Sequence, residues 1–298
     1  MGEQDERVSA ELVAVITAVQ NGVPLVLTTA DGRRLPSGPL QSGHRSMQAG
    51  MRSWVARQTG YDLGYVEQLY TFADRGRGPR PVLEVSYLGL TTVSAVTPGW
   101  RSWLEYFPWE DHRSGDDGVI AATLAPALAA WASSTTAAQA ERRRLRVAVT
   151  FGLDGHPWLP DMALQRYELL YEAGLLPEAH GGDPTPGTGL PMERDHRRIL
   201  ATGIGRLRAK IQYRPVVFEM LPESFTLSRL RSTVEAVAGQ HLHKQNFRRL
   251  VEQQELVEET GEVDATTGGR PAKLFRFRRA VLDEREAAGT KLPIVRPR

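Results

Sequence analysis

The segment between residues 221 and 277 constrains the fold of this 298-residue chain most, because two helix patterns in it lead directly into two strand patterns. Four apolar residues recur at the spacing of one helix face: Leu227, Leu230, Val234 and Val237. Thr226 or Ser224 can cap the start of this helix, and Gly239 stands where a left-handed residue would end it. The pattern predicts a short amphipathic helix that stops at a glycine turn.

A second helix pattern follows the glycine, and its two faces differ in chemistry. Three apolar residues share one face: Phe247, Leu250 and Val251. Polar and basic residues fill the rest of its N-terminal half: Lys244, Gln245, Asn246, Arg248 and Arg249. Because Gln and Asn pair bidentately with adenine and Arg with guanine, this half has the chemistry of a base-reading helix. Glu252 lies further along, where we expect it to stay outside a groove.

Two short strand patterns and a basic loop complete the segment. Leu256 and Val257 begin the first strand, and residues 274–277 form the second. The loop TTGGRP between them, residues 266–271, would present Arg270 to a minor groove or to phosphate. This order is that of a winged helix-turn-helix, which lays one helix in the major groove of DNA. We therefore expect DNA contacts from Thr226, Lys244, Gln245, Asn246, Arg248, Arg249, Arg270 and Lys273.

Two other interpretations of this segment remain open. A basic residue on a helix is often only part of a solvated face. Winged helices also bind proteins, although those that do so often lack a basic reading face. A salt-sensitive complex with DNA would distinguish the DNA-binding interpretation from both.

Charge is distributed unevenly along the chain, although the formal net charge is only +2. From Asp195 to the end there are 20 Lys and Arg against 13 Asp and Glu, so the preceding part is acidic. This asymmetry is consistent with a DNA-binding domain joined to a sensor. The absence of cysteine excludes disulfides and thiolate metal sites. Without a long apolar stretch or an apolar N-terminal core, we expect a cytoplasmic protein that does not enter the membrane.

The preceding part alternates between strand and helix patterns, which predicts an α+β fold. A β-hairpin is expected over residues 12–29, turning at Gln20-Asn21-Gly22. In a helix over residues 45–58, the apolar spacing turns four side chains inward: Met47, Met51, Trp54 and Val55. The other expected elements are strands over 63–72, 82–95 and 145–151 and helices over 119–133 and 161–174. Pro126 should kink the first of these helices or mark its real start.

A Gly- and Pro-rich stretch predicts the boundary between two domains. Residues 180–194 have the composition of a linker with nothing to bury. We expect a ligand-sensing domain over residues 1–179, a DNA-binding domain over 195–287 and a tail over 288–298. A helix from Asp195 would open the second domain, with its Arg and Lys residues pointing away from its apolar face. That face would carry Leu200, Ile204, Leu207 and Ile211.

Residues 35–61 resemble a Nudix box: LPSGPLQSGH is followed by an amphipathic helix and by QTGY. Residues 68–80, 82–90 and 164–176 also resemble Nudix domains. Together with the winged helix, most of the chain resembles the Nudix-related transcriptional regulators of bacterial NAD metabolism, the NrtR and NadQ types. The resemblance implies an N-terminal Nudix-like α/β/α sandwich with a mixed sheet, followed by a winged helix-turn-helix.

This chain departs from the Nudix pattern at the residues that hydrolysis requires. In Nudix enzymes a cluster of carboxylates binds the divalent metal that polarises the diphosphate. Between Arg33 and Tyr61 this chain has no Asp or Glu, and His44 stands where the family has a Glu. The metal positions fall among Ser53, Trp54, Ala56, Arg57 and Gln58. We therefore expect no catalytic residue, no metal and no catalytic cofactor; the alternative is a Nudix hydrolase with a winged-helix appendage.

A Nudix-like cleft without its metal can still bind a nucleotide, and the resemblance implies an adenine-nucleotide effector: NAD, ATP or ADP-ribose. Aromatic rings would stack on it, and guanidiniums would bind its diphosphate oxygens. The candidate contacts are Arg52, Tyr70, Phe72, Arg75, Arg77 and Arg80. In the alternative interpretation Tyr70 and Phe72 are core residues of a strand, and the loop arginines only aid solubility. The aromatic run over 100–109 favours a core or a dimer face, with shelter for an adenine as the alternative.

These observations predict a ligand-responsive transcription factor. By resemblance it would repress genes of NAD biosynthesis or salvage. We expect it to bind double-stranded DNA as a homodimer on a palindromic operator, because paired reading helices need paired half-sites. The ligand would change the spacing of the two reading helices.

Overall fold

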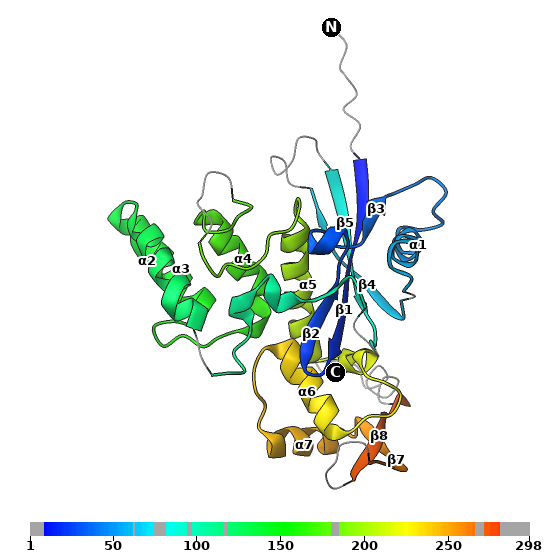
Figure 1. Cartoon of the computed structure of the whole chain (residues 1–298). Coiled ribbons are helices and arrows are strands. Elements are labelled where there is room, and N and C mark those ends of the chain that lie inside the picture. Colours follow the sequence, from blue (N-terminus) through cyan, green and yellow to red (C-terminus); the bar gives the residue numbers. More distant parts are fainter. Residues whose placement is uncertain are drawn as a thin grey trace, which may run out of the picture.

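The computed structural model of the chain describes residues 9–61, 63–73, 82–93, 97–115, 118–179, 185–265 and 271–280. In these ranges a mixed sheet lies between helices, and a smaller helical and two-stranded unit lies at one end of it (Figure 1). None of the helices in these ranges combines the length and the apolar composition that crossing a bilayer requires.

The main sheet has the strand order β4-β5-β1-β2-β6, and β3 pairs with β1. Its strands are β1 (Ser9–Gln20), β2 (Val23–Leu27), β3 (Ser37–Pro39), β4 (Tyr65–Phe72), β5 (Val82–Leu90) and β6 (Trp100–Ser102). The β1–β5 pair is parallel and the other pairs are antiparallel. Asn21 and Gly22 connect β1 to β2 with φ of 50° and 73°, the left-handed pair that a tight hairpin turn needs. The predicted hairpin is therefore confirmed.

Strand β1 is buried on both faces because a helix covers each side of the sheet. Its residues Leu12, Ala14 and Ile16 pack with α1 (Met47–Thr59), whereas Val13 and Val15 face α5 (His196–Ile211). Figure 1 shows these helices on opposite sides of the sheet. The predicted inward residues Met51 and Val55 of α1 are buried, but Met47, the first residue of the helix, is 41% exposed.

A helical subdomain extends from the α5 side of the sheet. It contains a π-helical turn (Ile120–Leu124), α2 (Ala125–Ser133), α3 (Ala137–Phe151) and α4 (Ala163–Glu172). Pro126 lies directly after the π-helical turn, and the residues before it are already helical, so the proline distorts a continuing helix rather than marking its start. The predicted strand over 145–151 is wrong: these residues form the last two turns of α3. The alanine-rich start propagates the helix, and Ala140, Val147 and Phe151 give it a buried stripe.

The aromatic run over 100–109 forms core. Trp103, Tyr106 and Phe107 are fully buried, and Trp109 is nearly so. They pack with residues of the sheet, of α4 and of α5 in one apolar cluster. The core interpretation of this run is therefore the one that the structure supports.

Helix α5 differs from its prediction in what its cations do. Arg197, Arg208 and Lys210 are buried, although the apolar stripe alone predicted that they would point away from the core. Each has acceptors inside the molecule: Glu178 and main-chain carbonyls for Arg197, Glu110 for Arg208, and Glu67 for Lys210. Buried charge is tolerated where such partners exist, and a helix periodicity does not reveal partners distant in sequence.

The described part of the predicted linker, residues 185–194, is attached to the N-terminal part. The main-chain N–H groups of Thr185 and Leu190 donate to carbonyls of Leu175 and Glu105, at 3.1 and 2.8 Å. Thr188 and Met192 are buried. Because α5 also shares the apolar cluster of β1, we propose that the boundary lies after Ile211 rather than within 180–194.

The C-terminal unit has the predicted order of elements. A 3-10 turn (Val216–Met220) precedes α6 (Leu227–Ala238), α7 (Lys244–Gln253), β7 (Val257–Asp264) and β8 (Ala272–Phe277). The side chain of Thr226 accepts the N–H of Arg229 at 3.1 Å, and Gly239 ends α6 with φ of 69°, so both predicted caps are confirmed. A separate apolar cluster, including Phe225, Leu230 and Val251, holds the unit together.

Candidate nucleic-acid interface and ligand site

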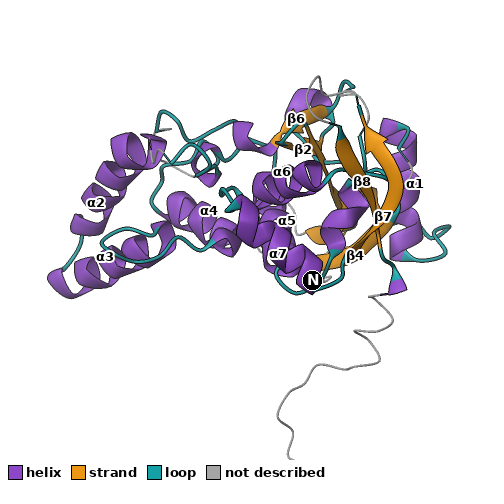
Figure 2. Ribbon diagram, turned by 90° about the horizontal axis from the view of Figure 1, so that it is seen from below, coloured by secondary structure: helices purple, strands orange, loops and turns teal. Residues whose placement is uncertain are grey.

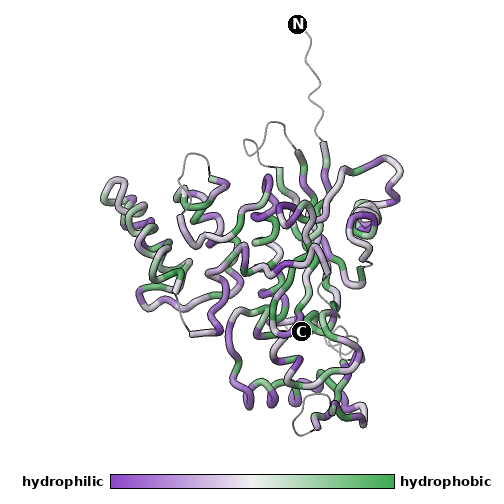
Figure 3. Tube along the Cα trace, viewed as in Figure 1, coloured by the Kyte–Doolittle hydropathy of each residue, from purple (hydrophilic) through white to green (hydrophobic). Residues whose placement is uncertain are grey.

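Helix α7 presents its polar residues to solvent and its apolar residues to its own domain. Five side chains are exposed along one continuous surface: Lys244, Gln245, Asn246, Arg248 and Arg249. Phe247 and Val251 pack into the apolar cluster of the winged helix. Figure 3 shows the hydrophilic residues of α7 on the side turned away from the rest of the molecule. Leu250, predicted on the apolar face, is 49% exposed, because it stands at the edge of that face.

Two of the predicted cationic contacts have acidic neighbours. Arg248 donates from Nε to Glu252 at 2.7 Å one turn along α7, and this hydrogen bond raises the pKa of Arg248. Lys273 on β8 pairs across the strands with Glu259 at 2.9 Å. Exposed pairs of this kind add little to stability, so both cations remain able to exchange their partners for phosphate or base oxygens. Arg270 lies outside the described residues.

The turn that leads into α7 is held by Glu235, a residue that the sequence did not single out. Its buried carboxylate accepts the N–H of Leu242 at 2.9 Å and pairs with Arg231 at 2.7 Å. The bond from Leu242 connects the last turn of α6 to the turn two positions before α7 begins. No local pattern marks this role, because a Glu on a helix usually faces solvent.

The predicted nucleotide contacts have different surroundings. Phe72 is buried, with the Arg198 guanidinium 5.0 Å from its ring centroid, so it is a core residue. Tyr70 is 59% exposed and meets Phe72 edge to face at 5.0 Å, so its ring remains available for stacking. Arg52 donates to the carbonyls of Leu63 and Gly64, so its guanidinium is bonded to the loop that connects α1 to β4. Arg75, Arg77 and Arg80 lie outside the described residues.

A charged cluster beside Phe72 was not predictable from the sequence, because its members are far apart in the chain. The parallel register of β1 and β5 places Glu11 beside Glu84, and Arg194 pairs with both. Burial, together with the neighbouring Asp195 and Glu11, raises the pKa of Glu84 to about 7 despite the opposing charge of Arg194. Next to them, buried His196 accepts the N–H of Leu35 at 2.9 Å, and burial lowers the pKa of His196 to about 4.

The side chains on α1 do not fit a Nudix-type magnesium site. Trp54 donates its indole N–H to the carbonyl of Pro39 at 3.1 Å, and the Arg57 guanidinium lies 4.0 Å from the Trp54 ring. Gln58 bonds both main-chain groups of Ser37. In the described part of the chain no three His, Asp or Glu residues come together in a way that could hold a metal. Divalent magnesium prefers several hard oxygen anions, which these residues do not supply.

Comparison with known proteins identifies the C-terminal unit. Residues 217–277 match the family model of the NrtR DNA-binding winged helix domain. The ADPR responsive transcriptional repressor NtrR of Acinetobacter baylyi (strain ATCC 33305 / BD413 / ADP1) is 35% identical over 88 residues, which are 30% of this chain. The matched part spans only 35% of that relative's length.

Solved structures match almost the whole chain. NrtR of Shewanella oneidensis, complexed with a 27mer DNA, has a TM-score of 0.54 at 19% identity and covers 92% of this chain and 95% of its own. A MutT/nudix family protein from Enterococcus faecalis also has a TM-score of 0.54, at 16% identity, and covers 92% and 90%. At such identities the likeness shows the fold. The predicted fold, a Nudix-like part with a mixed sheet followed by a winged helix, is therefore confirmed.

Proposed function

We propose that this chain, which has an NrtR-type winged helix and the overall fold of NrtR, is a DNA-binding transcriptional repressor that responds to a nucleotide ligand. The observation that carries the proposal is the exposed reading face of α7. Gln245, Asn246 and Arg249 have donors and acceptors for base edges, and their helix is anchored by its opposite face. The match of residues 217–277 to a DNA-binding family supports the same function.

The N-terminal part would then be a sensor rather than an enzyme. The positions of the Nudix metal ligands are filled by side chains that bond to the protein itself, such as Trp54 and Gln58. The matched relative is named a repressor, which agrees with a regulatory role. Purified protein should release no AMP from ADP-ribose in the presence of Mg²⁺; metal-dependent turnover would instead revive the hydrolase alternative.

The effector that the comparisons favour is ADP-ribose, because the curated relative is named ADPR responsive. NAD and ATP, which share its adenosine diphosphate portion, were the other candidates. Tyr70 has an exposed ring that meets Phe72, the residue paired with Glu84 in the sheet, and is our candidate stacking residue. Titration calorimetry with all three nucleotides, on wild type and Tyr70→Ala, tests the choice: we expect ADP-ribose to bind tightest and the variant to bind more weakly.

The remaining parts of the proposal concern assembly and target. A palindromic operator would be read by two copies of α7, so we propose a homodimer acting in the cytoplasm on genes of NAD metabolism. Sedimentation of the protein with and without DNA tests the stoichiometry. Binding of one chain to one unpaired half-site would contradict the dimer.

The direct test of DNA binding begins with selection of genomic fragments by the purified full chain. Fluorescence anisotropy on the recovered DNA should give a Kd that weakens steeply with salt, since each neutralised phosphate releases a counterion. Sequence-independent binding, or none, would refute the assignment of α7 as a base reader. The same titration with ADP-ribose tests the response to ligand.

A further inference from the structure

The winged helix is held against the N-terminal part mainly by α6. This helix contacts β1, β2 and α5, as Figures 1 and 2 show from two directions. Its neighbour α7 packs on α6 and shares the apolar cluster of the winged helix. The orientation of the reading helix therefore depends on how firmly the end of α6 is held.

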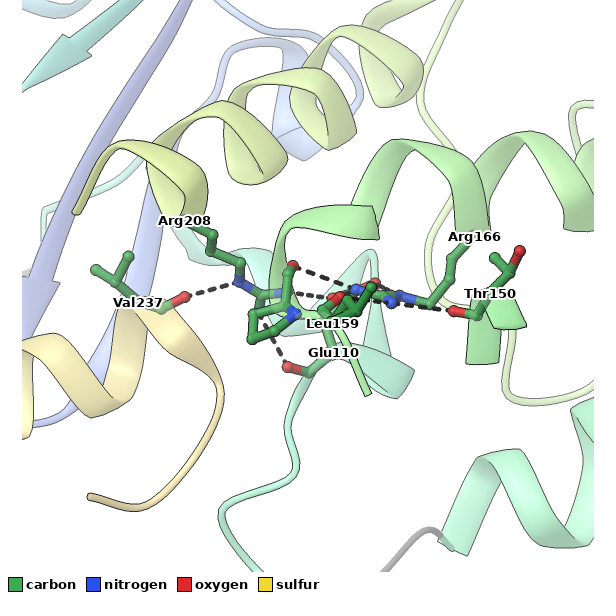
Figure 4. Close-up of polar contacts among 7 residues, drawn as sticks. Glu110, Thr150, Leu159, Arg166, Arg208 and Val237 are labelled. Atoms are coloured by element: carbon green, nitrogen blue, oxygen red, sulfur yellow. Dashed lines mark hydrogen bonds and ion pairs between the residues drawn. The ribbon is translucent and has the colours of Figure 1, made fainter. Parts of the chain in front are cut away.

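Three buried charged residues meet at this junction (Figure 4). Glu110 follows the buried aromatic run, Arg166 is on α4 and Arg208 is on α5. Arg166 donates from Nε and Nη2 to the two oxygens of Glu110, at 2.6 and 3.0 Å, while Arg208 pairs with Oε2 from the other side. All three side chains are essentially inaccessible to solvent.

We call Glu110, Arg166 and Arg208 the ion triad. The arginine N–H groups of the triad that do not bond to Glu110 donate to main-chain carbonyls. Arg166 donates to Thr150 and Leu159, at 3.2 and 3.1 Å, and Arg208 donates to Pro160 at 3.0 Å. Burial alone would raise the pKa of Glu110, but the two guanidiniums outweigh it and hold that pKa below its ordinary value. The carboxylate therefore stays charged, and every member depends on the others for its partners.

One bond of the triad crosses to the winged helix. Arg208 donates from Nε to the carbonyl of Val237 at 2.8 Å, in the last turn of α6 (Figure 4). Two residues later, the carbonyl of Gly239 accepts the N–H of His112 at 2.7 Å. At Gly239 an added Cβ would lie 2.2 Å from the carbonyl oxygen of Glu110, so the main-chain segments at Gly239 and Glu110 are in direct contact.

This arrangement leaves the end of α6 little freedom. Moving it away would break the bond from Arg208 to Val237 and leave a buried, charged N–H donor without an acceptor, which is unfavourable. The turn after Gly239 leads within four residues into α7. A fixed C-terminus of α6 therefore fixes the start of the reading helix relative to the N-terminal part.

We propose that Arg208 is a positioning residue for DNA recognition: it locks the C-terminus of α6 to the Glu110–Arg166 pair and so transmits changes in the N-terminal part to α7. The proposal rests on the proposed function for its consequence in DNA binding. The lock itself is a property of the chain alone and is testable without DNA or ligand.

The test compares two buried arginines of the same helix, Arg208→Lys and Arg197→Lys. Arg197 is equally buried and donates to Glu178 and to carbonyls of Tyr106 and Thr188, all within the N-terminal part. Lysine keeps the positive charge in both variants but lacks the planar fork, so it cannot serve a carboxylate and a distant carbonyl together. We expect similar losses of thermal stability from the two variants.

Hydrogen exchange separates the lock from general stability. In Arg208→Lys, amides of residues 236–243 should exchange about ten-fold faster or more, because local opening there no longer breaks buried bonds. In Arg197→Lys they should exchange at the wild-type rate. Unchanged exchange in Arg208→Lys, or equal acceleration in both variants, would overturn the proposal.

Gly239→Ala and Gly60→Ala are a second pair of matched variants, and neither replaces a residue of the ion triad. Both glycines end a helix with a left-handed φ, 69° and 74°, but an added Cβ at Gly60 meets nothing within 4 Å. Only Gly239→Ala would push against Glu110, so only it should accelerate exchange of residues 236–243. Equal behaviour of these two variants would also count against the lock.

A DNA-binding experiment tests the functional consequence. It measures the Kd for selected DNA with ADP-ribose and without it, and takes the ratio of the two values. A ratio that falls to about one in Arg208→Lys and persists in Arg197→Lys supports transmission through the lock. A ratio unchanged in Arg208→Lys contradicts transmission. If the wild type binds no DNA, the proposed function fails, and the exchange experiments still decide whether Arg208 positions α7.

Discussion

Helices α5 and α7 carry arginines in opposite environments. Arg197 and Arg208 on α5 are buried and bonded inside the molecule, whereas Arg248 and Arg249 on α7 stand in solvent. Both helices show an apolar stripe with cations placed off it, and on that ground all four cations were expected to face outward. The difference lies in what surrounds each helix. Helix α5 has neighbours on most sides, and α7 has its own domain on one side only.

The comparison shows which arginines serve the fold and which serve recognition. A buried guanidinium can use its five N–H groups only if acceptors are already in place around it, and then its removal damages the structure. An exposed one adds little to stability and keeps its donors for an external partner. Stability and DNA binding should therefore respond to different arginines of the same chain.

The largest expected effect is on stability, from Arg208→Met. The variant leaves the carboxylate of Glu110 with one cation and the Val237 carbonyl without its donor, so the free energy of unfolding should fall by about 3–5 kcal/mol. Arg248→Ala on α7 should leave it close to the wild-type value, because the Arg248 side chain is exposed. Urea unfolding followed by tryptophan fluorescence measures both. Equal losses would erase the distinction between the two helices.

In the Glu11–Glu84–Arg194 cluster the buried charged residue is an acid, and burial disfavours its charged form. Because the pKa of Glu84 is about 7 in the fold against an ordinary 4.5, the folded state binds more protons between these values. Its contribution to stability is therefore lost as the pH rises from about 4.5 to about 7. Glu84→Gln should stabilise the protein by about 3 kcal/mol at pH 8 and hardly at all at pH 4.

Urea titrations of wild type and Glu84→Gln at several pH values check this sign. Between pH 6.5 and 4 His196 acts in the opposite direction, since its pKa is lowered to about 4 and the unfolded chain takes up the proton first. The variant should therefore lose stability through that range more steeply than wild type. A benefit of Glu84→Gln that grows toward low pH would contradict the assignment.

On the recognition side, Arg249→Ala should weaken binding to selected DNA by about 1–3 kcal/mol and relax base preference at one position. Its thermal midpoint should stay near that of wild type, because the side chain is exposed. Anisotropy titrations with the selected fragment and with single-base variants measure the loss. Undiminished selectivity would remove Arg249 from the set of base readers.

The smallest effect is expected from an exposed pair on the helical subdomain. Arg146 on α3 pairs with Glu172 on α4, and both side chains are about half exposed. Arg146→Ala should cost about 0–1 kcal/mol of stability and leave DNA binding unchanged, since the pair lies away from α7. It is also the control for Arg249→Ala, because both variants remove one exposed arginine. A DNA-binding defect would show that net charge, not position, governs affinity.

Much of the winged helix could be predicted from the sequence because its signals are local. The cap at Thr226, the left-handed Gly239 and the two-faced α7 each depend on residues within a few positions of one another. The hairpin at Asn21-Gly22 was predictable for the same reason. Helix α3 was misread as a strand at its end because a short β-branched run satisfies both periodicities.

What the sequence could not reveal depends on partners far apart in the chain. Glu110 meets Arg208 across 98 residues, and Glu84 is near Glu11 only through the register of β1 and β5. Among the candidate ligand contacts, Phe72 proved to be core and Arg52 is bonded to neighbouring carbonyls. Among the candidates that lie within the described residues, Tyr70 is the one whose surroundings leave it accessible.

Ligand-dependent DNA binding by the full chain is the property that a single titration tests most directly. Labelled DNA selected from the genome is titrated with wild-type protein at two salt concentrations, with and without ADP-ribose. The account predicts tight, salt-sensitive binding whose Kd changes by about 5- to 150-fold when ADP-ribose is added. A Kd that ADP-ribose leaves unchanged, or the absence of sequence-selective binding, would contradict it.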